Sequence, residues 1–289
     1  MMNNRINFIE NIIHLNNEGV SKVLAGQEKA GISQLNDALK MIDRALRTCQ
    51  LWNESHPKGL LQSEGSCHMV FPEKRYSIHS IVPLPGLRKF EDDSFFIYNG
   101  LFLLSTTTPP FVQNIAHGVA NSEKEDSSSV EEEFLFLVFS GCIIMNIALT
   151  YHKFAQFHRG KQVYAEKAER MYQLLSKLCE EMRTLMNEYP SKLRCMGGIA
   201  MLLFIAAVNN LSLLRHEKGK FEAAKGGFEK MVEILFSDAA GLYFGPSRLH
   251  SVDDTDEDTL PRSTIRREEV LEFILNVMCS RASKVAPAA

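Results

Sequence analysis

The chain has 289 residues, of which 45% are hydrophobic and 23% are charged, as is usual for a globular protein with one large domain or two small ones. Its net charge of −3 argues against a basic surface for nucleic acid, so no nucleic-acid partner is expected. Six scattered cysteines form no C-x-x-C pair. We therefore expect buried thiols, no metal site and a reducing compartment, namely the cytoplasm, with the nucleus as the alternative.

Two helices are predicted at the N-terminal end. Apolar residues recur at helical spacing over about 6–24 and again over about 28–52. Gly26 separates the two segments, and a glycine is the usual residue just after the end of a helix. The sequence therefore predicts a first helix pair over about 6–55.

The following segment, about 70–112, has a different composition and predicts a small β insertion. Five prolines fall in it, and helical periodicity is lost. Asn99-Gly100 stands between the apolar runs 95–98 and 101–104, a pattern that indicates a hairpin with a two-residue turn. A polar linker is expected over about 113–129, because Ser, Glu, Lys and Asp dominate its end.

Helical periodicity returns in the second half of the chain. Helices over about 130–157 and 163–187 give a second pair (130–188), and helices over about 191–217 and 221–236 give a third (191–237). An acidic loop and an amphipathic terminal helix follow over about 247–282. The apolar runs 134–149 and 196–208 are shorter than the roughly 18–20 residues of a membrane span, so we expect buried helices and no span.

The first and third pairs share a series of residues at identical intervals, which we call the ladder. A shared series of this length indicates a repeated helix–turn–helix unit. Its small residues predict close helix contact, and its two turn glycines predict a left-handed backbone. The ladder consists of Leu15, Asn17, Gly19, Gly26, Gly31, Leu35 and Ala38 in the first pair, and Val208, Asn210, Ser212, Gly219, Ala224, Phe228 and Met231 in the third.

The second pair carries the same ladder in two halves. Its first half is Ile144, Asn146 and Ala148, and its second half is Ala168, Tyr172 and Leu175. The gap between the halves is about eight residues longer, and we place the insertion at the turn between the helices, over 153–163.

The ladder resembles the tetratricopeptide repeat (TPR), with Asn146–Tyr151 matching its first helix and Gly219–Ala224 its turn. The resemblance implies a mainly α fold, a single TPR-like domain over 1–289 whose repeats form an α-solenoid or bundle. An unrelated helical bundle is the alternative. It also implies a concave groove, lined by first helices, that binds an extended peptide or a partner helix. The positions that would line this groove are Asn16, Val20, Val23, Met145, Leu149, His152, Asn209, Leu213 and His216.

No catalytic motif stands out. His152 and His158 have no carboxylate at the next helical turn, and no G-x-S-x-G segment or phosphate-binding loop occurs. We therefore expect a non-catalytic adaptor for a protein or peptide, without a cofactor. The alternative is a structural helical subunit of a larger complex, whose groove is filled by its own β insertion or terminal helix. The oligomeric state is left open.

Overall fold

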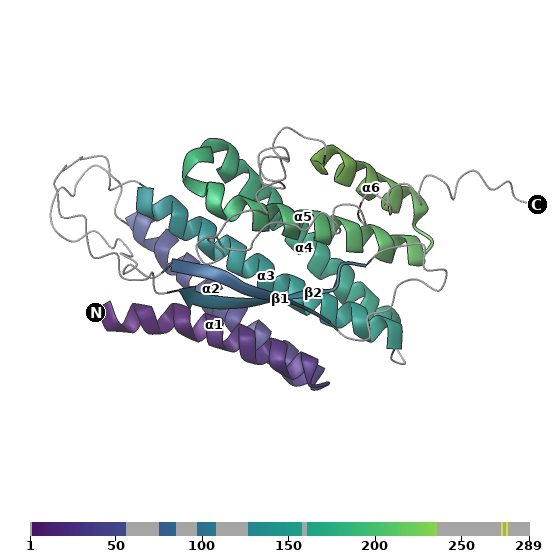
Figure 1. The fold of residues 1–289 in the computed structure, drawn as a ribbon, viewed down its shortest axis with the longest axis horizontal. Coiled ribbons are helices and arrows are strands. Elements are labelled where there is room, and N and C mark those ends of the chain that lie inside the picture. The colour runs from purple at the N-terminus through teal and green to yellow at the C-terminus, as the bar shows by residue number, and fades with distance from the viewer. Residues whose placement is uncertain are drawn as a thin grey trace, which may run out of the picture. The chain divides into compact units, whose positions relative to one another are not determined.

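The computed structural model describes residues 2–55, 75–84, 97–107, 127–157 and 161–235, together with Phe273 and Asn276. The described chain is mainly helical with a small two-stranded sheet, as expected (Figure 1). Its elements are α1 (Met2–Leu24), α2 (Glu28–Ser55), β1 (Arg75–Pro83), β2 (Gly100–Thr107), α3 (Ser127–Phe157), α4 (Lys161–Glu188), α5 (Pro190–Glu217) and α6 (Phe221–Leu235).

The chain forms two compact units that do not follow the order of the sequence. The first unit takes residues 1–81 and 102–143, and the second takes 82–101 and 144–289. Helices α1 and α2 belong to the first unit, and α4, α5 and α6 to the second. β1, β2 and α3 each contribute residues to both units.

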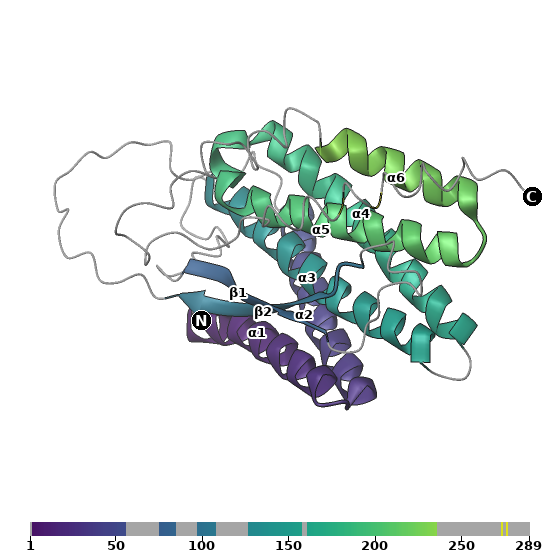
Figure 2. The ribbon, with the colours of Figure 1, turned by 45° about the vertical axis from the view of Figure 1, so that its right-hand side comes forward.

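In the first unit, α1 packs against α2 around a tight glycine turn (Figure 2). Gly26 has a φ of +76°, in the left-handed region that favours glycine. Its N–H donates to the carbonyl of Val23 (3.1 Å), and the N–H of Gln27 donates to the carbonyl of Lys22 (2.8 Å). This pair of bonds is the Schellman motif, which satisfies carbonyls at the end of α1.

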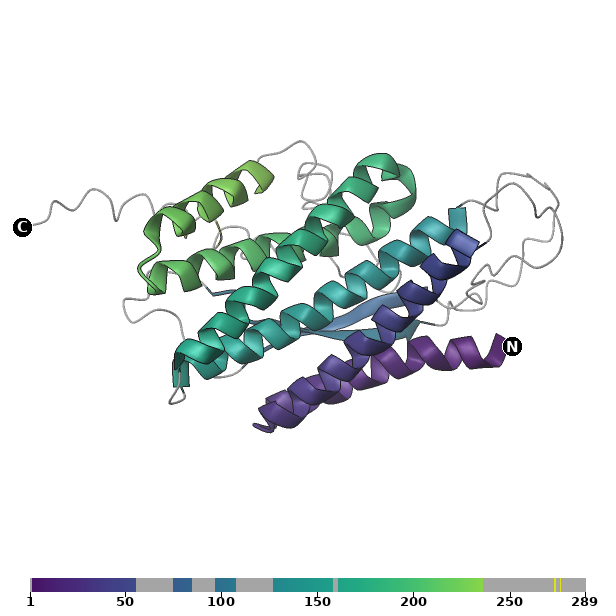
Figure 3. The ribbon, with the colours of Figure 1, turned by 180° about the vertical axis from the view of Figure 1, so that it is seen from behind.

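In the second unit, α5 and α6 meet at a turn of the same geometry (Figure 3). Gly219 has a φ of +71°. Its N–H donates to the carbonyl of His216 (2.9 Å), and the N–H of Lys220 donates to the carbonyl of Arg215 (2.8 Å). The bonds occur at the same ladder positions as in the α1–α2 turn, as expected from the two turn glycines.

Small ladder residues permit the close approach of α1 and α2. A Cβ atom added to Gly31 would lie 2.6 Å from the carbonyl oxygen of Gly19, and one added to Gly19 would lie 2.9 Å from Cγ of Leu35. Real Cβ atoms essentially never come this close, so the two glycines set the distance between the helices.

The corresponding contact of α5 and α6 is shifted by one helical turn. Ala224 is buried as expected, but the closest approach lies at Gly227, where an added Cβ would be 2.0 Å from Oγ of Ser212. Sequence reasoning missed Gly227 because the first pair has Gln34 at the equivalent position.

The second pair buries its ladder residues as well, since Ala148, Ala168, Tyr172 and Leu175 have no accessible surface. α3 continues to Phe157, as expected, and α4 begins at Lys161, close to the expected 163. Most of the extra residues placed over 153–163 therefore belong to the two helices. No breaker occurs within 153–157 or 161–163, and apolar side chains there extend the helical pattern.

The expected hairpin turn at Asn99-Gly100 is wrong. Gly100 begins β2, and among the described glycines only Gly26 and Gly219 have a positive φ. β2 pairs instead with β1, and the N–H of Leu84 donates to the carbonyl of Asn99 (2.8 Å), so the strands run antiparallel. Asn-Gly permits a turn but does not require one, and two strands of eight and nine residues offer more pairing than two four-residue runs.

The two long apolar helices are core helices. Glu133–Phe157 and Met196–Glu217 are long and apolar enough to cross a membrane. Both helices are longer than the apolar runs 134–149 and 196–208 from which the sequence analysis judged their length. The most apolar window of each is 94% buried inside the protein, as expected for core helices. Cys142 and Cys179 are buried free thiols, also as expected.

Two other predicted segments are affected by the limits of the described residues. The linker over 113–129 ends earlier than expected, because 127–129 already belong to α3, while its other residues lie outside the described chain. The acidic loop lies outside it too, and only Phe273 and Asn276 of the terminal helix lie within it, both helical and fully buried.

Candidate functional site: asparagines that hold an extended segment

The ladder asparagine of the first pair, Asn17 on α1, binds the backbone of β2 within the first unit. Its Nδ2 donates to the carbonyl of Leu104 (2.7 Å), and its Oδ1 accepts from the N–H of the same residue (2.9 Å). The neighbouring Asn16 donates to the carbonyl of Phe102 (3.0 Å). A single amide side chain thus satisfies both backbone groups of one extended residue, as a neighbouring strand would.

The ladder asparagine of the third pair, Asn210 on α5, makes the same two bonds within the second unit. Its Oδ1 accepts from the N–H of Tyr98 (3.0 Å), and its Nδ2 donates to the carbonyl of Tyr98 (2.8 Å). Asn17 and Asn210 occupy the same ladder position, so each binds both backbone groups of one residue within its own unit by the same chemistry.

The alternation of an extended chain explains which backbone groups of β2 meet the asparagines of α1. N–H and C=O groups of successive residues point to opposite edges of a strand, so Phe102 and Leu104, two residues apart, present theirs to the same edge. The carbonyl of Phe102 accepts from Asn16, and both backbone groups of Leu104 bind Asn17. These two asparagines therefore cover backbone groups that the two-stranded sheet would otherwise leave unpaired.

Asn210 uses the whole hydrogen-bonding capacity of its amide. Besides its bonds to Tyr98, its Nδ2 donates to the hydroxyl of Tyr172 (3.2 Å), and its Oδ1 accepts from Nδ2 of Asn209 (3.1 Å). Asn209 in turn accepts a bond from Nδ2 of Asn276 (2.6 Å). Asn209, Asn210 and Asn276 have no accessible surface, so these bonds form without competition from water.

The network ends at His152 on α3. The Tyr172 hydroxyl accepts from Asn210 (3.2 Å) and is also hydrogen-bonded to Nδ1 of His152 (3.2 Å), where the tautomer of the ring decides which of the two donates. Nε2 has no hydrogen-bond partner in the described part of the chain. Complete burial lowers the pKa of His152 to about 4 and raises the pKa of Tyr172, so both side chains are neutral at pH 7.

The nine predicted groove residues are almost all enclosed by the chain itself. His216 keeps some exposure and packs edge-on against Phe221 with ring centroids 5.0 Å apart. The other eight are buried: Asn16, Val20, Val23, Met145, Leu149, His152, Asn209 and Leu213. Their role toward a partner stays a prediction.

The residues that hold the backbone with both amide atoms are members of the ladder, but the sequence analysis gave them no binding role. Asn16 and Asn209 were placed in the groove, whereas Asn17 and Asn210 follow them directly and make the two-atom contacts. The tandem Asn-Asn pairs at equivalent ladder positions were the available signal, since two adjacent amides on one helix can reach neighbouring peptide groups.

A separate charged cluster lies on the second unit, near the α5–α6 turn. Glu169 forms ion pairs with Lys218 (2.8 Å), Lys220 (3.3 Å) and Arg215 (3.5 Å). Burial alone would raise the pKa of the Glu169 carboxyl, but the hydrogen bonds and charges of the two lysines outweigh it and leave this pKa lowered. The cluster joins α4 to the turn and presents no uncommitted carboxylate.

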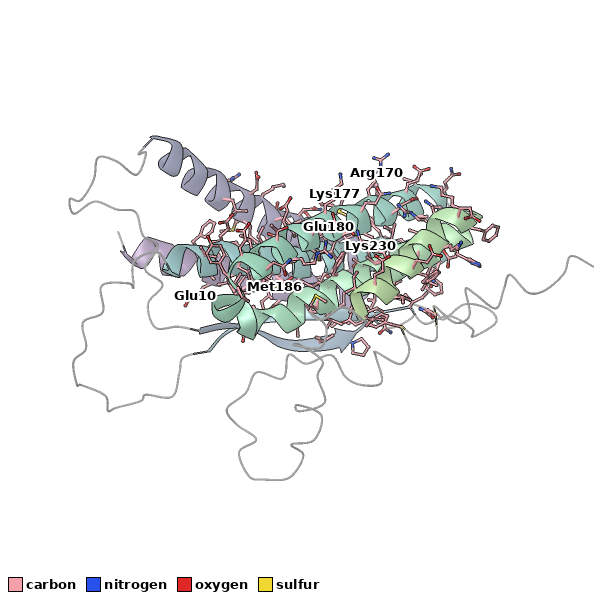
Figure 4. All side chains as sticks on the ribbon, turned by 90° about the horizontal axis from the view of Figure 1, so that it is seen from above. Glu10, Arg170, Lys177, Glu180, Met186 and Lys230 are labelled. Carbon is pink, nitrogen blue, oxygen red and sulfur yellow. The ribbon has the colours of Figure 1, made fainter. Side chains whose placement is uncertain are left out.

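A second ion pair joins α4 to α6 in the same unit. Figure 4 shows Glu180 and Lys230 directed toward one another from these helices. Both side chains are more than one third exposed, so the pair adds little stability.

Sites of other kinds are not evident in the described part of the chain. It contains no group of three or more His, Cys, Asp or Glu side chains that could hold a metal ion. An open surface depression lies along α2, where Ser33, Asn36, Leu39, Lys40 and Asp43 line it. The depression includes none of the ladder asparagines. No protein-family model, curated protein or solved structure matches this chain.

Proposed function

We propose that this protein is a non-catalytic adaptor, built from TPR-like helix pairs stacked as an α-solenoid, that binds a protein or peptide partner through its ladder asparagines. The observation that supports the proposal most is the repeated contact itself. Asn17 and Asn210, at equivalent positions of two pairs, each bind both backbone groups of one extended residue. Recognition of an extended backbone by main-chain hydrogen bonds is a general mode of peptide binding.

In the present conformation, the chain's own segment Ile97–Thr107 occupies these asparagines. A tethered segment competes at a high effective concentration, of the order of millimolar for a short flexible tether. An external peptide must overcome this competition, so the conformation described corresponds to a closed form of the adaptor.

A second candidate is a structural helical subunit of a larger complex, in which the internal segment never leaves. The enclosure of the segment favours it: Leu101 and Phe102 are adjacent, point to opposite faces of the strand, and are both inaccessible to solvent. In that case any partner binds another surface, and the asparagines serve folding alone.

Partner capture with matched variants separates the two candidates. We would purify tagged full-length wild type, Asn17→Ala and Asn210→Ala from cells and quantify the proteins bound to each, with Asn187→Ala as the control because Asn187 is an exposed asparagine on α4. The adaptor requires at least one partner whose recovery changes in both ladder variants and not in the control. Recovery of the same partners in equal amounts by all four folded proteins would leave only the structural subunit.

A further inference from the structure

Helix α4, within the second unit, carries an exposed stripe that combines apolar and basic side chains. Val163 is 56% exposed and Leu174 is 47% exposed, which makes them two of the four exposed large apolar side chains in the described part of the chain. Three exposed cations recur with them every three or four positions: Lys167, Arg170 and Lys177. Residues at this spacing lie on the same side of a helix, so the five form one surface, which we call the basic face.

The cations of the basic face are not neutralised by neighbouring carboxylates. Arg170 and Lys177 project from α4 into solvent (Figure 4), and neither forms an ion pair with another side chain of the described residues. The exposed Glu166 beside the face accepts a hydrogen bond from Gln162 (3.3 Å), and Glu181 marks the C-terminal end of the face. The basic face therefore keeps an excess of positive charge.

Lys167 is held in place before any partner binds. Its ammonium nitrogen lies over the rings of Tyr151 (5.3 Å) and Tyr164 (5.8 Å), measured to the ring centroids. These two rings stack on each other with centroids 6.4 Å apart. A cation–π contact leaves N–H groups of the ammonium able to donate to an anion. Because the side chain is already ordered, binding of an anion there costs less conformational entropy.

We propose that the basic face of α4 is a docking surface for an acidic amphipathic helix of a partner protein. Val163 and Leu174 contact apolar residues of that helix, and the three cations pair with its Asp or Glu side chains. The face runs from Val163 to Lys177, about 21 Å at a rise of about 1.5 Å per residue, so the partner contributes about four helical turns. The basic face contains none of the ladder asparagines, and the inference therefore goes beyond the proposed function and does not depend on it.

The composition of the face favours a partner helix over an anionic membrane. α4 already turns its own apolar side to the core, where Ala168, Tyr172 and Leu175 have no accessible surface. Only two apolar side chains of the basic face remain to enter a bilayer, whereas helices that bind membranes insert a whole apolar side. A partner helix repeats its side chains at the same spacing as α4, so ion pairs and apolar contacts can form along the whole stripe. Exposed ion pairs contribute little singly, and the apolar contacts are therefore needed as well.

Fluorescence anisotropy with the full-length protein tests the ligand class. The probe is a labelled helical peptide of about 18 residues, with leucine and glutamate on one side and alanine and glutamine elsewhere. In one control peptide lysine replaces every glutamate, and in the other alanine replaces every leucine. We expect both controls to bind at least tenfold more weakly than the probe, and added salt to weaken binding of the probe. No binding of the probe, or equal binding of all three peptides, overturns the proposal.

Charge-reversal variants test whether the probe binds the basic face. Arg170→Glu and Lys177→Glu replace a cation of the face by an anion, and Arg183→Glu is the matched control because Arg183 is exposed on α4 outside the stripe. We expect each of the first two variants to bind the probe about fivefold more weakly, and the control to change its affinity by less than about twofold. Circular dichroism checks that each variant is folded. An equal effect of all three reversals, or no effect of any, overturns the proposal.

Two further measurements identify a different occupant of the basic face. Binding to vesicles of phosphatidylcholine and phosphatidylserine that Arg170→Glu abolishes would assign the face to an anionic membrane. A dimer in sedimentation velocity that Arg170→Glu dissociates would assign it to a second copy of this chain. We expect neither result, and either of them overturns the proposal.

Discussion

Replacing Asn210 by alanine removes the contact at the centre of the second unit. The substitution deletes two bonds to the Tyr98 backbone, one to the Tyr172 hydroxyl and one from the Asn209 amide, all at a position without accessible surface. Each buried polar group that loses its partner costs about 1–3 kcal/mol. Because a water molecule can enter part of the space, we expect Asn210→Ala to lower the free energy of unfolding by about 3–5 kcal/mol in total.

Urea unfolding followed by circular dichroism measures this effect against two matched variants. Asn17 is half-buried and loses the two bonds to Leu104 and one from the Asn16 amide, so Asn17→Ala should cost about 1–2 kcal/mol. Asn187→Ala, on an exposed face of α4, should stay within about 0.5 kcal/mol of the wild type. A loss below about 1 kcal/mol for Asn210→Ala, or no difference between Asn210→Ala and Asn187→Ala, would refute the network.

Two further predictions concern the helix seam and the buried histidine. Gly31→Ala places a Cβ 2.6 Å from the Gly19 carbonyl oxygen and should destabilise the fold by about 1–3 kcal/mol. The control Gly226→Ala meets nothing within 4 Å and should stabilise α6 by about 0.5–1 kcal/mol. Equal melting temperatures of these two variants would contradict the close approach of α1 and α2. His152 is neutral in the fold, and its pKa falls from 6.5 to about 4, so the unfolded chain binds the extra proton first as pH decreases. The stability gained from a neutral His152 is therefore full above about pH 6.5 and is lost progressively toward pH 4, by about 3 kcal/mol. His152→Phe should lack this dependence when the free energy of unfolding is measured by urea titration at pH 7 and pH 4.5. A wild type whose pH dependence matches that of His152→Phe would be inconsistent with complete burial.

The sequence predicted the parts of the fold that depend on local chemistry. Turn glycines need a left-handed backbone, and small residues at helix seams need contact at a fixed interval, so Gly26, Gly219, Gly19 and Gly31 leave a readable pattern. The same reasoning failed at Asn99-Gly100. Whether this dipeptide forms a turn depends on which segment pairs with the residues that follow it, and that segment is the distant β1.

The candidate site could be predicted only in part for the same reason. The ladder placed asparagines at equivalent positions, but which segment they bind is a long-range property that spacing alone does not encode. The contacts from Asn17 to Leu104 and from Asn210 to Tyr98 join residues about a hundred positions apart. The alternative in which the β insertion occupies the groove named the relevant segment, although not the atoms that hold it.

Residue-specific hydrogen exchange of the Tyr98 and Leu104 amides tests most directly whether the ladder asparagines hold the extended segment. We predict that both amides are protected in the full-length protein, that Asn210→Ala removes protection at Tyr98 while Leu104 keeps it, and that Asn17→Ala does the reverse. Rapid exchange of both amides in the wild type, or protection that neither substitution alters, would contradict this account.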